Sequence, residues 1–138
     1  MSSAITTMSQ KKGSLLSRQF VVDKLSSVFS QYIADIQGVF LYGSTARQQN
    51  KEQSDVDILV IWKKRIPQSA VALKEKLEKI FSRKVDLVCM IYMKKLMYDF
   101  DKIDLTQNEC FLENVHRDAV SIIGDKEDIC FSRHIKKI

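Results

Sequence analysis

Apolar side chains recur in the first part of the chain at the spacing of an amphipathic helix. The pattern covers residues 15–36, and Gly38, two residues further on, is expected to end the helix. Among the side chains that the pattern directs to the core are Phe29, Tyr32 and Ile33. The preceding segment, 1–13, is small, polar and aperiodic, which predicts a flexible N-terminal lead-in.

Three short apolar runs predict buried β-strands. They cover residues 39–42, 55–62 and 84–91, and each contains the β-branched or aromatic residues that strands favour. After Pro67, apolar residues return at helical spacing over 69–82. The side chains that this second helix is expected to turn towards the core are Val71, Leu73, Leu77, Ile80 and Phe81.

The remaining pattern completes one domain. Helices are expected over 93–101 and 106–117, and an edge strand over 119–123. The last residues, 126–138, are expected to form a C-terminal tail that is frayed at its HIKKI end. The order of helices and strands indicates an α/β protein, with helices packed on one sheet within a single domain, 14–125.

Composition narrows the class of protein. A chain of 138 residues has room for one core, and 45% hydrophobic with 28% charged residues argues against a disordered or membrane protein. No apolar stretch approaches the roughly 20 residues that span a bilayer, and no apolar signal segment opens the chain. The three cysteines show no CxxC spacing, so a disulfide scaffold or structural zinc is not expected and a reducing cytoplasm is the expected location.

The net charge leaves several partners open. The formal charge is +5, from 22 Lys and Arg against 17 Asp and Glu. Such an excess suits nucleic acid, a polyanionic nucleotide or solubility alone. The densest basic run, Lys63, Lys64 and Arg65, is interpreted as a solvated cluster at the end of a strand. No stripe of interleaved basic and aromatic residues is apparent, so direct nucleic-acid binding is not expected.

A G-S-x10-D-x-D pattern lies between the first two predicted strands. Gly43 and Ser44 end the first strand, where a small turn lets backbone N–H groups approach a phosphate. Ser44 is also expected to cap a short helix that starts at Thr45, with a dipole that favours the same anion. Asp55 and Asp57 are two residues apart on the second strand, so their side chains emerge on one face.

Paired carboxylates at this spacing indicate a divalent cation. Neighbouring carboxylates repel each other, and oxygen ligands with open coordination positions suit Mg²⁺. A third acid, Asp86, lies in the apolar run of the third strand and can face the same site if that strand pairs beside the second. Three acids around two Mg²⁺ ions suit in-line displacement at phosphorus. The alternative is that Ser44 only caps a helix and that the acids lie at a solvated strand end.

The residues of this pattern resemble a known family. The segment FLYGSTARQQNKEQSDVDILVIW, together with VDLV at 85–88, resembles the signature of the DNA polymerase β-like nucleotidyltransferases, and most closely their minimal nucleotidyltransferase (MNT) branch. The resemblance covers most of the chain. It implies a mixed sheet with flanking helices, and Mg²⁺-dependent transfer of a nucleoside monophosphate from a nucleoside triphosphate such as ATP, with release of pyrophosphate.

The resemblance also implies residue roles. Gly43 and Ser44 would hold the β- and γ-phosphates, and Arg47 matches the arginine of the family's G-S-x-A-R pattern and would steady the triphosphate. A helix-surface ion pair is the alternative for that arginine. Many relatives have glycine at the next position, where this chain has Gln48. The metal ligands implied by the resemblance are Asp55 and Asp57 for both ions, and Asp86 for the catalytic ion, where it would also help to deprotonate the attacking hydroxyl.

Two hypotheses of function follow. The first is an enzyme that moves AMP from ATP to a hydroxyl of a partner, because the chain leaves no room for a nucleic-acid or antibiotic-binding domain, although a dimer could build a drug pocket. The MNT resemblance suggests the antitoxin of a HEPN/MNT toxin–antitoxin pair, which adenylylates a HEPN ribonuclease. The second hypothesis is a binding module that neutralises its partner by contact. Three acids kept together favour the enzyme, and a homo-oligomer is compatible with both.

Other candidate residues carry less weight. His116 and His134 are far apart in the sequence, lack a metal-like set of neighbours and are expected to lie on the surface. Trp62 ends a predicted strand and is expected in the core or an interface.

Overall fold

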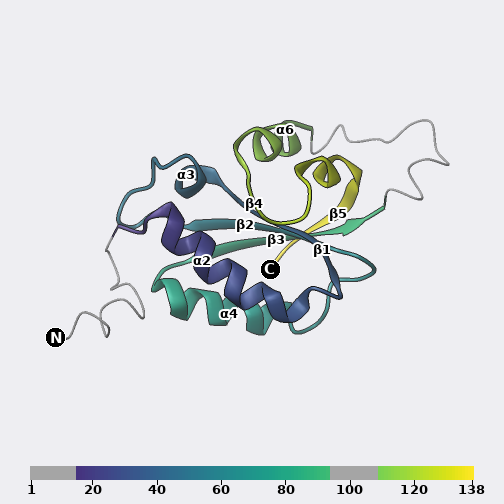
Figure 1. The fold of residues 1–138 in the computed structure, drawn as a ribbon, viewed down its shortest axis with the longest axis horizontal. Coiled ribbons are helices and arrows are strands. Elements are labelled where there is room, and N and C mark those ends of the chain that lie inside the picture. Colours follow the sequence, from purple (N-terminus) through teal and green to yellow (C-terminus); the bar gives the residue numbers. More distant parts are fainter. Residues whose placement is uncertain (1–14, 94–108) are drawn as a thin grey trace.

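The computed structural model describes residues 15–93 and 109–138, which form a five-stranded sheet with helices on both faces (Figure 1). Across the sheet the strand order is β4-β1-β2-β3-β5. Along the chain the strands are β1 (Ile36–Tyr42), β2 (Val56–Trp62), β3 (Val85–Tyr92), β4 (Val120–Ile123) and β5 (Ser132–Lys137). The helices are α2 (Arg18–Phe29), α3 (Gly43–Ala46), α4 (Ala70–Phe81) and α6 (Glu109–Asp118), with 3-10 helices η1 (Ser30–Tyr32) and η2 (Lys126–Phe131).

The sheet is mixed, as the family resemblance implied. β2 and β3 run parallel, with α4 as the crossover between them, and the other three pairings are antiparallel. The antiparallel pairing of β1 with β2 brings the end of β1 beside the start of β2. Since β3 starts at the same edge as β2, three strand ends meet there.

Alternation along the strands divides the core into two layers (Figure 1). In β2, Ile58 and Val60 pack in the larger cluster with α2 and α4, whereas Leu59 and Ile61 pack on the opposite face with α6 and η2. Both faces of the sheet are therefore covered, which explains why the central strands read as nearly continuous apolar runs.

The predicted strands and the second helix lie where the sequence placed them. β1, β2 and β3 extend or trim the predicted ranges by one to three residues at an end, and α4 covers all but the outer residues of 69–82. β4 is an edge strand, as expected for 119–123. α6 occupies the described part of the helix predicted over 106–117. Trp62 lies in the core, which is one of the two locations expected for it, the other being an interface.

The first helix is shorter than its periodicity predicted. α2 ends at Phe29 and gives way to η1, and Gly38 lies inside β1 instead of ending a helix. Ile33, expected in the core, is 58% exposed. The reason is tertiary: Ile36 pairs with Trp62 in the sheet, so the chain must leave the helix several residues earlier.

One side chain of α4 also departs from its predicted role. Val71, expected in the core, is 55% exposed. Leu73, Leu77 and Phe81 are buried at intervals of four residues. Val71 precedes Leu73 by two residues, which is about 200° around the helix, so it lies outside the apolar stripe.

The C-terminal segment is part of the fold, contrary to the tail expected over 126–138. η2 is followed by β5, which pairs with β3 as an outer strand of the sheet. The pairing places Lys137 opposite Val88, and the Ile138 backbone N–H donates to the Leu87 carbonyl at 2.9 Å. The segment lacks strand-like alternation, and its order comes from the backbone hydrogen bonds that β3 offers at its free edge.

Two predicted segments, the lead-in over 1–13 and nearly all of the helix over 93–101, lie outside the described residues. In the part that is described, no helix has the length and apolar character needed to cross a membrane.

Candidate active site

The structure brings the three predicted carboxylates to one edge of the sheet. Asp57 lies in β2, paired with Tyr42 of β1 on one side and with Asp86 of the parallel strand β3 on the other. Asp55 immediately precedes β2 and is close enough to Asp57 to influence its charge. In-register pairing of parallel strands about 4.8 Å apart places the Asp57 and Asp86 side chains on the same face.

We call Asp55, Asp57 and Asp86 the carboxylate edge. Burial makes the negatively charged form of these side chains unfavourable. The pKa of Asp57 is raised from 3.8 to about 6, first by burial and then by the negative charge of Asp86. A hydrogen bond to Asp86 from the protonated Asp57 carboxyl adds to the shift, as does the charge of Asp55. Burial and the same two carboxylates, Asp57 and Asp86, raise the pKa of Tyr42. The edge therefore has excess negative charge that a cation would relieve.

A lysine from the last strand partly offsets that charge. Lys137 Nζ lies 3.4 Å from Asp86 Oδ1, and the attraction between Lys137 and Asp57 opposes the rise in the Asp57 pKa. Asp86 Oδ1 is nevertheless buried without a hydrogen-bond partner. This oxygen is buried among other acids and accepts no hydrogen bond. Such an oxygen is suited to bind a divalent cation that prefers oxygen ligands, such as Mg²⁺.

The Gly-Ser turn faces the same edge. Gly43 has φ +75°, and a Cβ on this residue would collide with the Asp57 carboxylate, coming within 3.0 Å of Asp57 Cγ. Glycine is thus required both by the backbone conformation and by the close approach to the acid. Ser44 lies in the first turn of α3 but is not its cap, because the helix begins two residues earlier than predicted, with Tyr42 at the N-cap position.

Hydrogen bonds from distant residues hold α3 against the sheet. Arg18 Nη1 donates to the Ala46 carbonyl at 3.1 Å, tying α2 to the turn. Arg47, proposed from the resemblance to steady the triphosphate, here forms an ion pair with Asp118 at the end of α6, at 3.0 Å.

Gln48 has φ +59°, the left-handed region that glycine adopts most easily, which explains why glycine suits this position in relatives.

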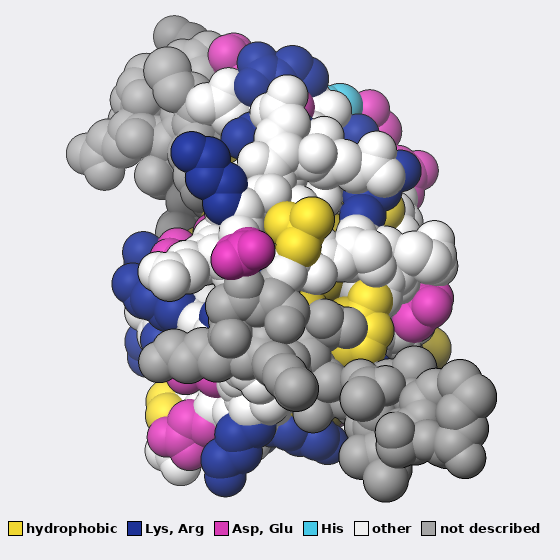
Figure 2. Space-filling view, turned by 90° about the vertical axis from the view of Figure 1, so that its left-hand side faces the viewer, with side chains coloured by type: hydrophobic (Ala, Val, Ile, Leu, Met, Phe, Trp, Pro, Cys, Tyr) yellow, Lys and Arg dark blue, Asp and Glu magenta, His cyan; other side chains and the backbone are white. Residues whose placement is uncertain are grey.

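Charges of both signs surround α3. Figure 2 views the end of the molecule that carries α3, and it shows Lys and Arg side chains mixed with Asp and Glu over the part of this face that grey residues do not cover. The mixture agrees with the scattered basic residues of the sequence.

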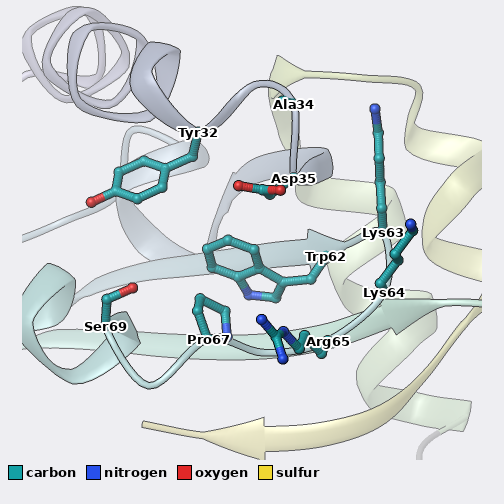
Figure 3. Close-up of a pocket in the computed structure, with 9 residues that line it drawn as sticks. All are labelled: Tyr32, Ala34, Asp35, Trp62, Lys63, Lys64, Arg65, Pro67 and Ser69. Atoms are coloured by element: carbon teal, nitrogen blue, oxygen red, sulfur yellow. The ribbon is translucent and has the colours of Figure 1, made fainter.

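A cavity lies at the opposite end of β2, near Trp62. It has a volume of about 550 Å³, and Figure 3 shows the Trp62 indole between Tyr32 and Asp35 on one side and Pro67 and Arg65 on the other. Trp62 and Asp57 are five residues apart on one strand, about 17 Å. The cavity is therefore separate from the carboxylate edge.

The sequence analysis missed two residues at the edge. Lys137 lay in the expected tail, and nothing in its local pattern marks a strand. Tyr42 was placed in a strand but given no role, although its position directly before Gly-Ser was a usable signal. Both residues are recognised only once β1 and β5 are paired with their neighbours.

A mixed sheet that gathers a Gly-Ser turn and three carboxylates at one edge is the arrangement of a nucleotidyltransferase. A family model described as "Polymerase beta, Nucleotidyltransferase" matches residues 23–100, more than half of the chain. The chain belongs to this family of nucleotidyltransferases.

Solved structures share the fold at low sequence identity. A toxin–antitoxin crystal structure with AMP-PNP has a TM-score of 0.56 and 20% identity, covering 78% of this chain and 77% of that one. A tri-AMPylated Shewanella oneidensis HEPN toxin in complex with MNT antitoxin has a TM-score of 0.52 and 20% identity, covering 80% and 76%. Spectinomycin adenyltransferase AAD(9) from Enterococcus faecialis, with ATP and spectinomycin, has a TM-score of 0.57 and 18% identity. Comparison with curated proteins gives no match.

Proposed function

We propose that this nucleotidyltransferase transfers AMP from ATP to a hydroxyl group of a partner protein. The observation that carries the proposal is the in-register pairing of Asp57 with Asp86 beside the Gly43 turn, with Asp55 two residues before Asp57. A structural role alone gives no reason to place three carboxylates where they repel each other. A nucleotide site gives one, because a cation and a triphosphate bind there together.

The three carboxylates would hold Mg²⁺, and the turn would hold the triphosphate. When bound, Mg²⁺ would offset the charge of the phosphates and polarise the phosphorus centre. Asp55 and Asp57 would hold both Mg²⁺ ions and Asp86 the catalytic ion, and the backbone at Gly43 and Ser44 would approach the β- and γ-phosphates closely. Release of Arg47 from Asp118 would be needed before Arg47 could reach a phosphate, since the ion pair occupies it here.

The transfer exchanges a phosphoanhydride bond of ATP for a phosphate ester bond on the acceptor. The acceptor oxygen forms a bond to the α-phosphorus, the bond from that phosphorus to the bridging oxygen breaks, and pyrophosphate leaves with the electron pair. Asp86 would accept the proton of the acceptor hydroxyl and pass it to solvent.

The acceptor is proposed from the structural neighbours. The chain covers 57% of spectinomycin adenyltransferase AAD(9). It covers about three quarters of the MNT antitoxin found with a tri-AMPylated HEPN toxin. We therefore favour a HEPN-type partner, with the protein acting as an adenylylating antitoxin in the cytoplasm, where ATP is available.

The test separates a covalent from a contact mechanism. The protein, ATP and Mg²⁺ are incubated with the product of its neighbouring gene, the two proteins are separated, and the partner is weighed by mass spectrometry and assayed. We expect the partner to gain AMP and to stay inhibited. The variant Asp57→Asn should bind the partner but transfer AMP about 10³-fold more slowly, since it loses a carboxylate of the metal site.

A binding module predicts different results. Inhibition would then vanish on separation, need no ATP and survive in the Asp57→Asn variant. Full recovery of an unmodified partner after separation from the wild-type protein would contradict the proposal.

A further inference from the structure

Three metal-binding side chains meet on the face of the molecule covered by α6 and η2. His116 Nε2 of α6 lies 3.1 Å from Glu127 Oε1 of η2, and Cys130 of η2 completes the group. The nitrogen, oxygen and sulfur atoms all lie within 4.8 Å of one another. His116 was expected to lack such neighbours, and that expectation is wrong, because the fold brings α6 and η2 together.

The local structure explains the convergence. Glu127 and Cys130 are three residues apart in a 3-10 helix, which has three residues per turn, so their side chains eclipse on one side. His116 faces them from the last turn of α6. All three side chains reach solvent, so an ion can enter without opening the core.

The spacing suits a small tetrahedral ion. Zinc bonds of about 2.0–2.1 Å to nitrogen and oxygen, and about 2.3 Å to sulfur, separate neighbouring ligand atoms by roughly 3.2–3.6 Å. The observed separation of 3.1 Å between His116 and Glu127 lies just below the short end of this range. Cys130 Sγ lies within 4.8 Å of the other two ligand atoms, so it has to come closer by at most roughly 1.3 Å to complete the set.

We propose that His116, Glu127 and Cys130 form a binding site for a zinc-class divalent cation, separate from the carboxylate edge. Imidazole and thiolate ligands favour Zn²⁺ over the harder Mg²⁺, which is expected at the three aspartates. Three protein ligands leave a fourth position for water or for a donor from a partner.

A thiol must lose its proton before its sulfur can bind a metal ion. Binding forms the metal–sulfur bond and releases that proton to solvent. The ion then ties α6 to η2, two elements whose described contacts include the pair between His116 and Glu127.

Cobalt provides a probe that distinguishes this site from the carboxylate edge. Co²⁺ is titrated into the full-length protein with its thiols reduced, and absorption is followed in the near ultraviolet. A sulfur-to-cobalt charge-transfer band reports a thiolate ligand, which aspartates cannot supply. We expect the band in the wild-type protein, and we expect Zn²⁺ to abolish it while excess Mg²⁺ leaves it unchanged.

Matched variants locate the ligand set. Cys130→Ser should lose the band, and His116→Ala should weaken Co²⁺ binding by at least about tenfold. Cys110→Ser, another cysteine-to-serine change, and Asp57→Asn, at the carboxylate edge, should both keep it. Circular dichroism checks that each variant is folded. Absence of the band in the folded wild-type protein, or its persistence in Cys130→Ser, would overturn the proposal whether or not the protein transfers AMP.

Discussion

The two ends of β2 carry opposite charges under different constraints. At its start, Asp57 is half-buried between Tyr42 and Asp86, and its carboxyl is held by the register of three strands. At its end, Lys63, Lys64 and Arg65 are exposed, and none of them forms an ion pair with another described residue. One strand thus separates a constrained acidic group from a solvated basic one.

The difference shows how burial turns like charges into a functional feature. Exposed cations are screened by water and salt, so three in a row cost little. Half-buried carboxylates are screened less, and burial first and then the charge of Asp86 raise the pKa of Asp57. Only the acidic end therefore has a physical reason to bind an ion of opposite charge, and the predictions below test that contrast.

The largest effect is expected from Gly43→Ala. The new methyl group would meet the Asp57 carboxylate, and alanine disfavours φ +75°. We expect the variant to lose AMP transfer and about 1–3 kcal/mol of unfolding free energy, measured by urea denaturation. Ser44→Ala is the matched control in the same turn, and it should change the unfolding free energy by less than about 0.5 kcal/mol. Equal stability of the two variants would contradict the close approach.

A smaller effect is expected from pH. The pKa of Asp57 is about 6 in the folded protein against 3.8 ordinarily, so the folded state binds more protons between these values. Stability of the metal-free protein should therefore fall as the pH rises from about 4 to 6, and then level off. Because the group is partly exposed, we discount the full shift and expect a loss of about 1 kcal/mol.

Urea midpoints measured across this pH range, with and without Mg²⁺, check that expectation. Asp57→Asn should flatten the profile and leave the metal-free protein as stable as the wild type or slightly more so, because it removes a repelling charge. A loss of several kcal/mol in this variant would instead identify Asp57 as a structural residue.

The smallest effect is expected at the basic end. Replacing Lys63, Lys64 and Arg65 together by alanine should change the unfolding free energy by no more than about 0.5 kcal/mol, since the three side chains are exposed and make no described ion pair. Thermal and urea unfolding of the triple variant measure this. A loss above about 1 kcal/mol would show that the two ends are more alike than their burial suggests.

Local patterns in the sequence were sufficient for the central strands and for the acids. The apolar runs at β1, β2 and β3 identify strands because burial on both faces requires them, and a spacing of two puts Asp55 and Asp57 on one face. The place of Asp86 followed from assuming that β3 pairs beside β2, and the observed register agrees. These features depend on residues that are close in the sequence or on one strand pairing.

Other features were decided only by the tertiary structure. Ile33 and Val71 are exposed although they are apolar, because the path of the sheet and the orientation of α4 turn them away from the core. Lys137 reaches Asp86 across 51 positions of sequence, through a strand that has no alternation of its own. His116 meets Cys130 through helix packing.

The physical reason is the range of the interactions. Periodicity and turn chemistry act within one element, and they are written in neighbouring residues. Edge pairing at β5 and the ion pair between Arg47 and Asp118 join elements that are distant in the chain. The partners in these long-range contacts are whichever strand edge or charged group lies nearby once the core has formed. The sequence by itself therefore determined the nucleotidyltransferase motif, and only the fold determined what surrounds it.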